Sequence, residues 1–255
     1  MLAALTRPPS RSIARCELTH LTREPIDFEA ACAQHRAFCG TLKRLGCRPI
    51  ELAPQHEMPD AVFVEDAAVV VDELAVITRP GAESRRGELA SVERALAEHR
   101  PIARIQAPGT LDGGDVLRVE RTVIVGLSSR TNEAGAEQLA SLLAPHGYDV
   151  RTARTGQCLH FLSACTYIGR GVVLVNPRWV DPATFDEFEI VEIDPSEPRA
   201  ANAVRVGETL VHADAFPKTQ ARLRERGFNV APVNNTELAK AEGAVTCCSV
   251  LFETK

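Results

Sequence analysis

Residues 115–152 read DVLRVERTVIVGLSSRTNEAGAEQLASLLAPHGYDVRT, and this stretch decides the fold. Two short runs rich in β-branched residues, 115–119 and 122–125, predict two tightly joined strands. The spacing of apolar residues predicts a helix over 132–144, with Asn132 as its N-cap and a glycine just past its end. A third strand completes the stretch. The unit is therefore strand, strand, helix, strand.

The same order of elements recurs along the chain. Comparable units are predicted over 67–106, 164–193 and 202–233, and their helices over 87–99, 181–187 and 217–226. The pieces left over make a fifth unit. In it, a C-terminal strand over 249–252 pairs with an N-terminal strand near 12–16, followed by a helix over 27–45 and a strand over 48–52. Such a unit would close a ring.

Units that bury their core only against neighbours are typical of repeat and propeller architectures. We therefore predict an α/β propeller of five ββαβ units with pseudo-five-fold symmetry, forming a single catalytic domain over residues 1–255. A doubly wound sheet is the competing fold. It would require a glycine-rich phosphate loop, and the sequence has neither G-x-G-x-x-G nor a P-loop.

Charge and hydropathy exclude several classes of function. The net charge is −5 and the arginines are dispersed among acids, so no basic surface for nucleic acid is expected. No apolar run reaches the roughly 18 residues of a membrane span, and residues 1–5 are too short for a signal peptide. Three arginines without an acid among the first 15 residues give only a weak resemblance to a transit peptide. We predict a soluble, cytoplasmic protein.

The eight cysteines do not indicate a disulfide framework, because they are scattered through a long chain without a signal peptide. No C-x-x-C pair and no Cys/His cluster with zinc-finger spacing occurs. Most cysteines are therefore expected to be small core residues. We predict no structural metal and no cofactor.

Chemically reactive residues precede the first strand of several units. Rotational symmetry would bring these segments together at one end of the ring axis. They are Asp60, Glu65 and Asp66 in MPDAVFVED, Asp112 in TLDGGD, His160 in CLHFLSA and Cys247 in VTCCSV. A thiolate can act as nucleophile, an imidazole can lower its pKa or shuttle protons, and carboxylates can orient the imidazole or the substrate.

Each of these residues also has an ordinary structural interpretation. A cysteine before a terminal strand commonly packs in the core, and Cys248 would do so. Asp112 could cap a glycine turn, and Glu65 and Asp66 could lie in a solvated loop. The functional interpretation is favoured because core residues have no reason to occupy equivalent positions in successive units.

Six segments in register carry a resemblance to a known family. PDAVFVED, ITRPGAESRRGE, TLDGGDVL, GLSSRTNEAGAEQLA, LHFLSAC and TCCSVL, spread over nearly the whole chain, together resemble dimethylarginine dimethylaminohydrolase. The resemblance implies the pentein fold, a five-unit α/β propeller with its active site on the axis. It also implies hydrolysis of Nω-methylated arginine to citrulline and a methylamine, within arginine metabolism and nitric oxide regulation.

The resemblance assigns roles to individual residues. It implies that Cys247 is the nucleophile, His160 the general acid and base, and Asp112 the carboxylate beside them, where some relatives have Glu. Glu65 and Asp66 resemble the acids that hold the guanidinium.

Further substrate-binding residues follow from the same resemblance. Asp60, Arg85 and Arg130 resemble the groups that fix the α-ammonium and α-carboxylate. Leu18 falls in a flexible lid, and Ala241 and Glu242 fall beside the substrate. The family often has Asp where this chain has Glu242.

The chemistry of a guanidinium adds two expectations. Surrounding acids should raise the pKa of the Cys247 thiol, so the cationic substrate itself should help to form the thiolate. A guanidine without a carboxylate, such as agmatine, should leave Arg85 and Arg130 unpaired and bind less well. Cys247, Cys248 and His160 could also bind zinc as an inhibitor, although the reaction needs no metal.

Other functions remain open at this level. The nearest rival is another guanidine-modifying enzyme of the same fold, such as an arginine deiminase or an amidinotransferase. Deiminases of free arginine usually carry an inserted helical domain, for which this chain has no room. A non-catalytic binding ring is a rival from another class. The sequence does not distinguish mono- from dimethylarginine, or a monomer from a homodimer.

Overall fold

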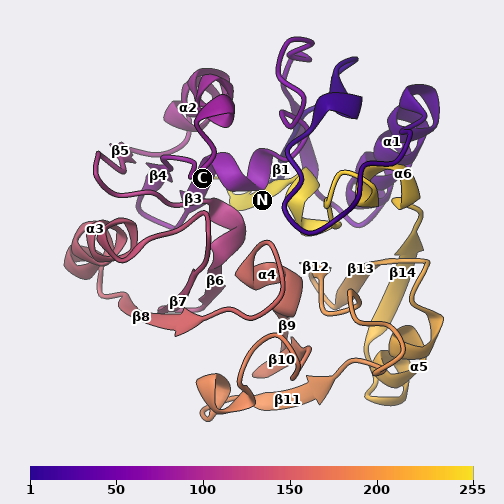
Figure 1. Cartoon of the computed structure of the whole chain (residues 1–255). Coiled ribbons are helices and arrows are strands. Elements are labelled where there is room, and N and C mark those ends of the chain that lie inside the picture. The colour runs from indigo at the N-terminus through magenta and orange to yellow at the C-terminus, as the bar shows by residue number, and fades with distance from the viewer. Residues whose placement is uncertain (255) are drawn as a thin grey trace.

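The computed structural model describes residues 1–254, and the strands of this part of the chain form five three-stranded sheets. Figure 1 shows the sheets arranged around a central axis, with helices α1, α2, α3 and α5 at the periphery. In strand order the sheets are β15-β1-β2, β3-β4-β5, β6-β7-β8, β9-β10-β11 and β12-β13-β14. The prediction of five units closed into a ring is confirmed.

The elements have the following bounds. The strands are β1 Leu2–Thr6, β2 Arg48–Glu51, β3 Ala68–Val70, β4 Ala75–Ile77, β5 Ile102–Arg104, β6 Val116–Val119, β7 Thr122–Leu127, β8 Asp149–Arg154, β9 Cys165–Gly169, β10 Val172–Val175, β11 Glu189–Glu192, β12 Ala203–Val206, β13 Thr209–Ala213, β14 Asn229–Val233 and β15 Val250–Glu253. The helices are α1 Phe28–Arg44, α2 Leu89–Ala97, α3 Glu133–Leu143, α4 Phe161–Ala164, α5 Pro217–Glu225 and α6 Thr236–Ala239.

All five sheets share one topology. The middle strand pairs antiparallel with the first strand of its unit and parallel with the third. An antiparallel pair needs only a tight turn, whereas a parallel pair needs a crossover. The helix between the second and third strands supplies that crossover, which explains the order of elements in the sequence.

The core is divided among the boundaries between units. One apolar cluster, for example, joins Val69 and Val76 of the first unit to Val116, Val123 and Leu139 of the second. Four further clusters lie between the other pairs of neighbouring units. No unit therefore has an apolar core of its own, as expected for repeats that are stable only when stacked.

The first strands of neighbouring units contact one another: β15 contacts β3, and β9 contacts both β6 and β12. These strands consequently line the axis. The segments that lead into them form short 3-10 helices, Val64–Ala67, Gly113–Asp115 and Thr246–Cys248, and these also contact one another. This arrangement gathers the reactive residues.

Helix boundaries follow local signals closely. The Asp27 side chain accepts the backbone N–H of Ala30 at 3.0 Å, and the Asn132 side chain accepts that of Gly135 at 2.8 Å, so each caps its helix. Gly46 and Gly147 adopt positive φ at 98° and 76° just past the helical segments, where glycine carries no steric penalty.

Two elements were predicted wrongly. The N-terminal strand is Leu2–Thr6, whereas residues 13–15 form a 3-10 turn. The sequence LAALT has only one β-branched residue, Thr6 at its end. Ala3 and Leu5 are nevertheless fully buried against the first unit, and this tertiary packing overrides local preference. The helix expected over 181–187 is only the 3-10 helix Pro182–Phe185, a single turn whose Phe185 fills the core.

Among residues 1–254, no helix is both long and apolar enough to cross a bilayer.

Candidate active site

The predicted reactive residues meet at the axis because each belongs to a turn that leads into a first strand. Glu65 and Asp66 lie in the 3-10 helix before β3, and Asp112 precedes the one before β6. His160 is the residue before α4, and Cys247 lies in the 3-10 helix before β15. Four units thus contribute to one site.

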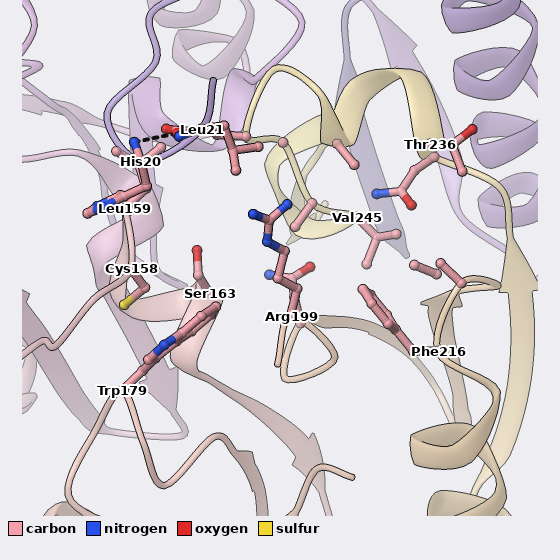
Figure 2. Close-up of a pocket in the computed structure, with 18 of the residues that line it drawn as sticks. His20, Leu21, Cys158, Leu159, Ser163, Trp179, Arg199, Phe216, Thr236 and Val245 are labelled. Carbon is pink, nitrogen blue, oxygen red and sulfur yellow. Dashed lines mark hydrogen bonds between the residues drawn. The ribbon is translucent and has the colours of Figure 1, made fainter. Parts of the chain in front are cut away.

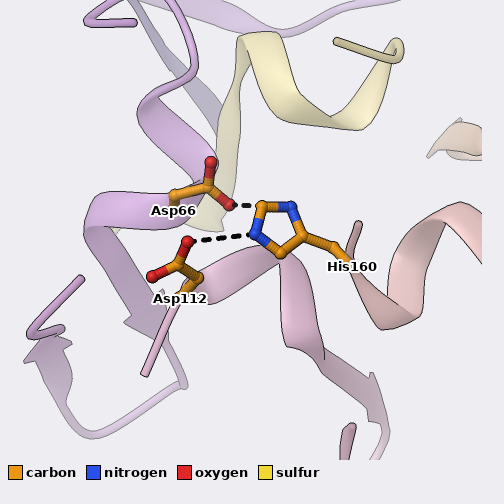
Figure 3. A group of neighbouring side chains, drawn as sticks. All are labelled: Asp66, Asp112 and His160. Atoms are coloured by element: carbon orange, nitrogen blue, oxygen red, sulfur yellow. Dashed lines mark hydrogen bonds and ion pairs between the residues drawn. The ribbon is translucent and has the colours of Figure 1, made fainter. Parts of the chain in front are cut away.

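His160 lies between two carboxylates (Figure 3). Its Nε2 is 3.0 Å from Asp112 Oδ2, and its Nδ1 is 3.6 Å from Asp66 Oδ1. Burial alone would lower the pKa of His160, but Asp66 and Asp112 outweigh it and raise the pKa to about 10. The imidazole is therefore protonated at neutral pH.

The glycine pair of TLDGGD is required for this packing. A Cβ at Gly113 would lie 2.0 Å from the carbonyl oxygen of Glu65, and a Cβ at Gly114 would lie 2.8 Å from Nδ1 of His160. The backbone N–H of Gly114 donates to Asp66 Oδ1 at 3.1 Å. Only glycine lets these two turns approach so closely.

Cys247 is a buried thiol in an acidic environment. Its side chain is 9% exposed, and the backbone N–H of Ala244 donates to Sγ at 3.4 Å. Burial and then the neighbouring Glu65 and Asp66 raise the pKa of Cys247 well above its usual range. Without substrate the group is a neutral thiol, in agreement with the prediction from the sequence.

Glu65 is itself affected by this environment. Burial and then the charge of Asp66 raise the pKa of Glu65 to about 8. Its Oε2 accepts the Thr246 hydroxyl at 2.8 Å, and the side chain of Asn202 is bonded to both the hydroxyl and the backbone N–H of Thr246. This chain of hydrogen bonds ties the turn that carries the nucleophile to two other units.

Arg85 is already paired. Its guanidinium donates to Asp66 and, through Nε and Nη2, to Glu88 at 3.2 and 2.9 Å. Nη2 also donates to the backbone oxygens of Asp60 and Phe63. The expectation that Arg85 has no partner without a substrate carboxylate is therefore wrong, because buried acids neutralise it. Arg130 is less committed, since its one side-chain hydrogen bond within residues 1–254 joins Nη2 to the hydroxyl of Thr19 at 3.2 Å.

The segment around Leu18, which the resemblance predicts to be a lid, is hydrogen-bonded to residues that line the cavity. The Glu242 carboxylate accepts the backbone N–H groups of Thr19, His20 and Leu21 at 3.0, 2.6 and 2.6 Å. Asp60 accepts the backbone N–H of Glu17, at 3.0 Å for the shorter of two contacts. Burial raises the pKa of Asp60 to about 6, although Arg85 opposes the shift.

One small cavity collects most of the predicted residues. It is lined by Asp60, Asp66, Arg85, Arg130, His160, Ala241, Glu242 and Cys247, among others, and its volume is about 20 Å³. Glu65, Asp112 and Leu18 do not line it. Asp112 is fully buried behind His160, and Leu18 packs against the apolar cluster of the fourth and fifth units.

Cys248 points elsewhere. Unlike Cys247, it does not line the catalytic cavity, and its Sγ lies 3.7 Å from the backbone oxygen of Ala244. The predicted zinc set of Cys247, Cys248 and His160 is not assembled among the described residues. The potential ligand atoms that do gather, all within 4.8 Å of one another, belong to Asp66, Asp112 and His160.

The sequence did not reveal several supporting residues. Asp115 is fully buried and accepts the backbone N–H of Phe161 at 2.9 Å and the hydroxyls of Ser128 and Thr131. It thereby fixes the start of α4, beside His160. The position of Asp115 in the GGD turn is the sequence feature that could have identified it. Glu88, three residues after Arg85, could have been recognised as an ion-pair partner from that spacing.

Comparisons with known proteins agree with this geometry. A family model described as arginine deiminase matches residues 54–210. The N(G),N(G)-dimethylarginine dimethylaminohydrolase of Streptomyces coelicolor is 41% identical over 97% of this chain and 95% of its own length. The protein of the same name from Pseudomonas aeruginosa is 34% identical, over 97% and 98%.

Solved structures match as well. A Pseudomonas aeruginosa dimethylarginine dimethylaminohydrolase variant complexed with citrulline superposes with a TM-score of 0.94 at 33% identity, covering 98% of each chain. A dimethylarginine dimethylaminohydrolase adduct with S-methyl-L-thiocitrulline gives 0.93 at 33% identity, covering 99% of this chain and 100% of the other.

The five-bladed ring with a cysteine and a histidine at its axis is the pentein fold of guanidine-modifying enzymes. Within that class, the chain belongs to the dimethylarginine dimethylaminohydrolase family, whose members hydrolyse C–N bonds.

Proposed function

We propose that this protein hydrolyses Nω-methylated arginine to citrulline and a methylamine through a covalent thiouronium on Cys247. The observation that carries the proposal is that Cys247 and His160 line the same small cavity as Asp60, Asp66 and Arg130. Two relatives that match almost the whole chain carry the name of this activity, and one solved relative holds citrulline.

Binding selects a planar cation. Asp66 presents a carboxylate to the cavity, and Glu65 is the preceding residue of the same 3-10 helix. The N–H edges of a guanidinium match carboxylate oxygens in geometry and charge. We assign the α-carboxylate of an amino acid to Arg130 and its α-ammonium to Asp60, because both residues line the same cavity as Cys247. We assign Arg85 to the support of Asp66 and Asp60, because its donors are already bonded to groups around them.

Substrate binding also activates the nucleophile. A cation beside the thiol favours its charged form and lowers a pKa that burial and acids have raised. The thiol releases its proton to solvent, and the thiolate then attacks the central guanidinium carbon to form a neutral tetrahedral adduct. The imidazolium of His160 gives its proton to the departing methylamine, and the thiouronium remains on sulfur.

The second half reverses the proton flow. His160, now neutral, accepts a proton from water as the oxygen attacks the same carbon. The adduct collapses as its hydroxyl proton is released to solvent, the carbon–sulfur bond breaks, and citrulline leaves the thiolate. Asp112 and Asp66 hold the ring in place and favour its charged form throughout.

Mass spectrometry tests the proposal directly. Protein quenched during turnover of dimethylarginine should carry an amidino adduct on Cys247. An adduct on another residue, or none, counts against the mechanism. The nearest alternative is deimination of free arginine. A higher kcat/KM for dimethylarginine than for arginine decides against it. We also infer that residues 1–255 act as one catalytic domain, and a cytoplasmic location stays a prediction.

A further inference from the structure

A second, larger cavity lies beside the catalytic one (Figure 2). Its volume is about 150 Å³, compared with about 20 Å³ for the catalytic cavity. The two cavities share Leu159, Glu242 and Gly243 in their walls. A void of this size holds several waters or a small organic molecule. No step of the proposed reaction uses it.

The walls are largely apolar. Trp179 and Phe216 face the cavity from opposite sides, and Val245, Ala213 and Ala239 add aliphatic surface. Concave, mostly apolar surfaces with a few polar groups are typical of small-molecule sites. The body of a suitable ligand is therefore apolar, and an aromatic ring can pack between Trp179 and Phe216.

One cation gives the cavity its charge preference. Figure 2 shows the Arg199 side chain rising into the space between Trp179 and Ser163 on one side and Phe216 on the other. Arg199 forms no hydrogen bond or ion pair with any group in residues 1–254. Glu242 is the one acid among the described lining residues, and its carboxylate is taken by the lid amides. A guanidinium beside apolar walls favours an anion with a planar, two-oxygen head group.

We propose that this cavity is a second ligand site for small monocarboxylates with an aromatic or branched apolar body, distinct from the catalytic cavity. The carboxylate pairs with Arg199, and the apolar body lies between Trp179 and Phe216. The hydroxyl of Ser163 is close enough to the same space to add a donor.

The site is coupled to the lid. His20 and Leu21 line it while their backbone N–H groups are bonded to Glu242. A ligand that contacts these residues stabilises the lid in its closed position. Since Glu17 of the same segment lines the catalytic cavity, ligand and citrulline should tighten one another's binding by the same factor.

Trp179 makes the test specific, because it is the only tryptophan in the chain. The probe is 3-phenylpropionate, titrated into the intact protein while Trp179 emission is followed, with calorimetry on the same samples. Saturable binding is expected. Arg199→Gln should weaken it about tenfold or more, the usual effect of losing a charge-assisted hydrogen bond. The control is Arg94→Gln, another exposed arginine without an ion pair within residues 1–254, on α2; it should leave binding unchanged.

Two further binding measurements test whether the carboxylate is recognised and whether the site is separate from the catalytic cavity. The uncharged analogue 3-phenylpropan-1-ol should bind more weakly than the acid and be indifferent to Arg199→Gln. Saturating citrulline should raise the affinity of 3-phenylpropionate, because both ligands favour the same position of residues 19–21. Absence of binding, equal affinity for acid and alcohol, or displacement by citrulline would each overturn the proposal. These readouts need no turnover, so they stand apart from the test of the proposed reaction.

Discussion

Arg85 donates to the carboxylate of Asp66, and Asp66 in turn lies 3.6 Å from Nδ1 of His160. The substrate-binding role that the family resemblance implies for Arg85 does not account for this contact. Arg85 neutralises two buried acids, Asp66 and Glu88, and so supports the groups around the histidine.

Arg85→Ala should consequently lower both stability and kcat. Removing one member of a buried ion-pair cluster leaves charges without a partner, at a cost of about 3–5 kcal/mol. Arg130→Ala serves as the comparison, because Arg130 lines the same cavity with one hydrogen bond, and it should mainly raise KM. Chemical denaturation and steady-state kinetics measure the two effects. A stable Arg85→Ala protein with only KM changed would return Arg85 to simple substrate binding.

Cys247→Ser should abolish turnover, by at least about a thousandfold, because an alcohol is a much weaker nucleophile at this position. Cys248→Ser is the matched variant one residue away. Cys248 packs in the apolar cluster and should retain much of the activity while losing some stability. The opposite pattern would move the nucleophile.

Gly114→Ala tests the close approach of two turns. The added methyl would lie 2.7 Å from Asp66 Oδ1 and 2.8 Å from His160 Nδ1, so the two side chains must separate. We expect kcat to fall about a hundredfold, the usual effect of misplacing a catalytic group by about 1 Å. Gly40→Ala within α1 meets its nearest atom at an ordinary 3.6 Å and should leave kcat unchanged. Equal kcat for both variants would contradict the tight packing.

The pH dependence should have an acid limb. The pKa of Asp60 is raised to about 6, so its carboxylate is lost below that pH, together with its contact to the lid and its charge toward the substrate ammonium. We expect kcat/KM to decline as pH falls through about 6 and Asp60→Asn to remove the limb. A limb that persists in this variant would belong to Asp115, whose pKa burial also raises to about 6.

At alkaline pH, the rate of adduct formation should reflect the titration of His160. Its pKa of about 10 means that the imidazolium, the acid for the departing amine, is lost only above that pH. The rate of adduct formation should therefore hold through neutral pH and fall near pH 10. Single-turnover measurements across this range check it, and a fall already near neutrality would exclude the proposed protonation state.

The lid contact can be tested through Glu242. Replacing it by Ala removes the acceptor for three backbone N–H groups, and we expect KM to rise roughly tenfold as closure becomes less favourable. Glu29→Ala, an exposed acid on α1, is the control. Faster proteolysis near residues 17–21 in Glu242→Ala alone would report the same loosening. An unchanged KM and cleavage pattern would separate Glu242 from the lid.

Much of this architecture could be predicted because the units repeat. Alternating β-branched runs and helix caps such as Asn132 give the order of elements, and the order gives the ring. The reactive residues then follow from their equivalent positions. Local reasoning failed at Leu2–Thr6, where burial against another unit forms a strand from residues with weak strand preference.

The sequence predicts which residues belong to the site more readily than it predicts which of their side chains pair. Cys247, His160 and Asp112 stand in motifs, whereas the pairing of Arg85 with Asp66 and Glu88 depends on side-chain directions that spacing does not specify. The neutralisation of Arg85 and the lid contact of Glu242 required the folded structure. The second cavity did as well, because residues from several units line it.

Because β1 pairs with β15, the geometry of the reactive centre depends on closure of the whole ring. Cys247 lies three residues ahead of β15, and His160 is held by the unit on the far side of the axis. If β1 and β15 separate, the distance between the Cys247 sulfur and the His160 imidazole is no longer fixed. Catalysis should then fail before most of the secondary structure is lost. A drop in turnover would be the earliest sign that β1 and β15 have separated.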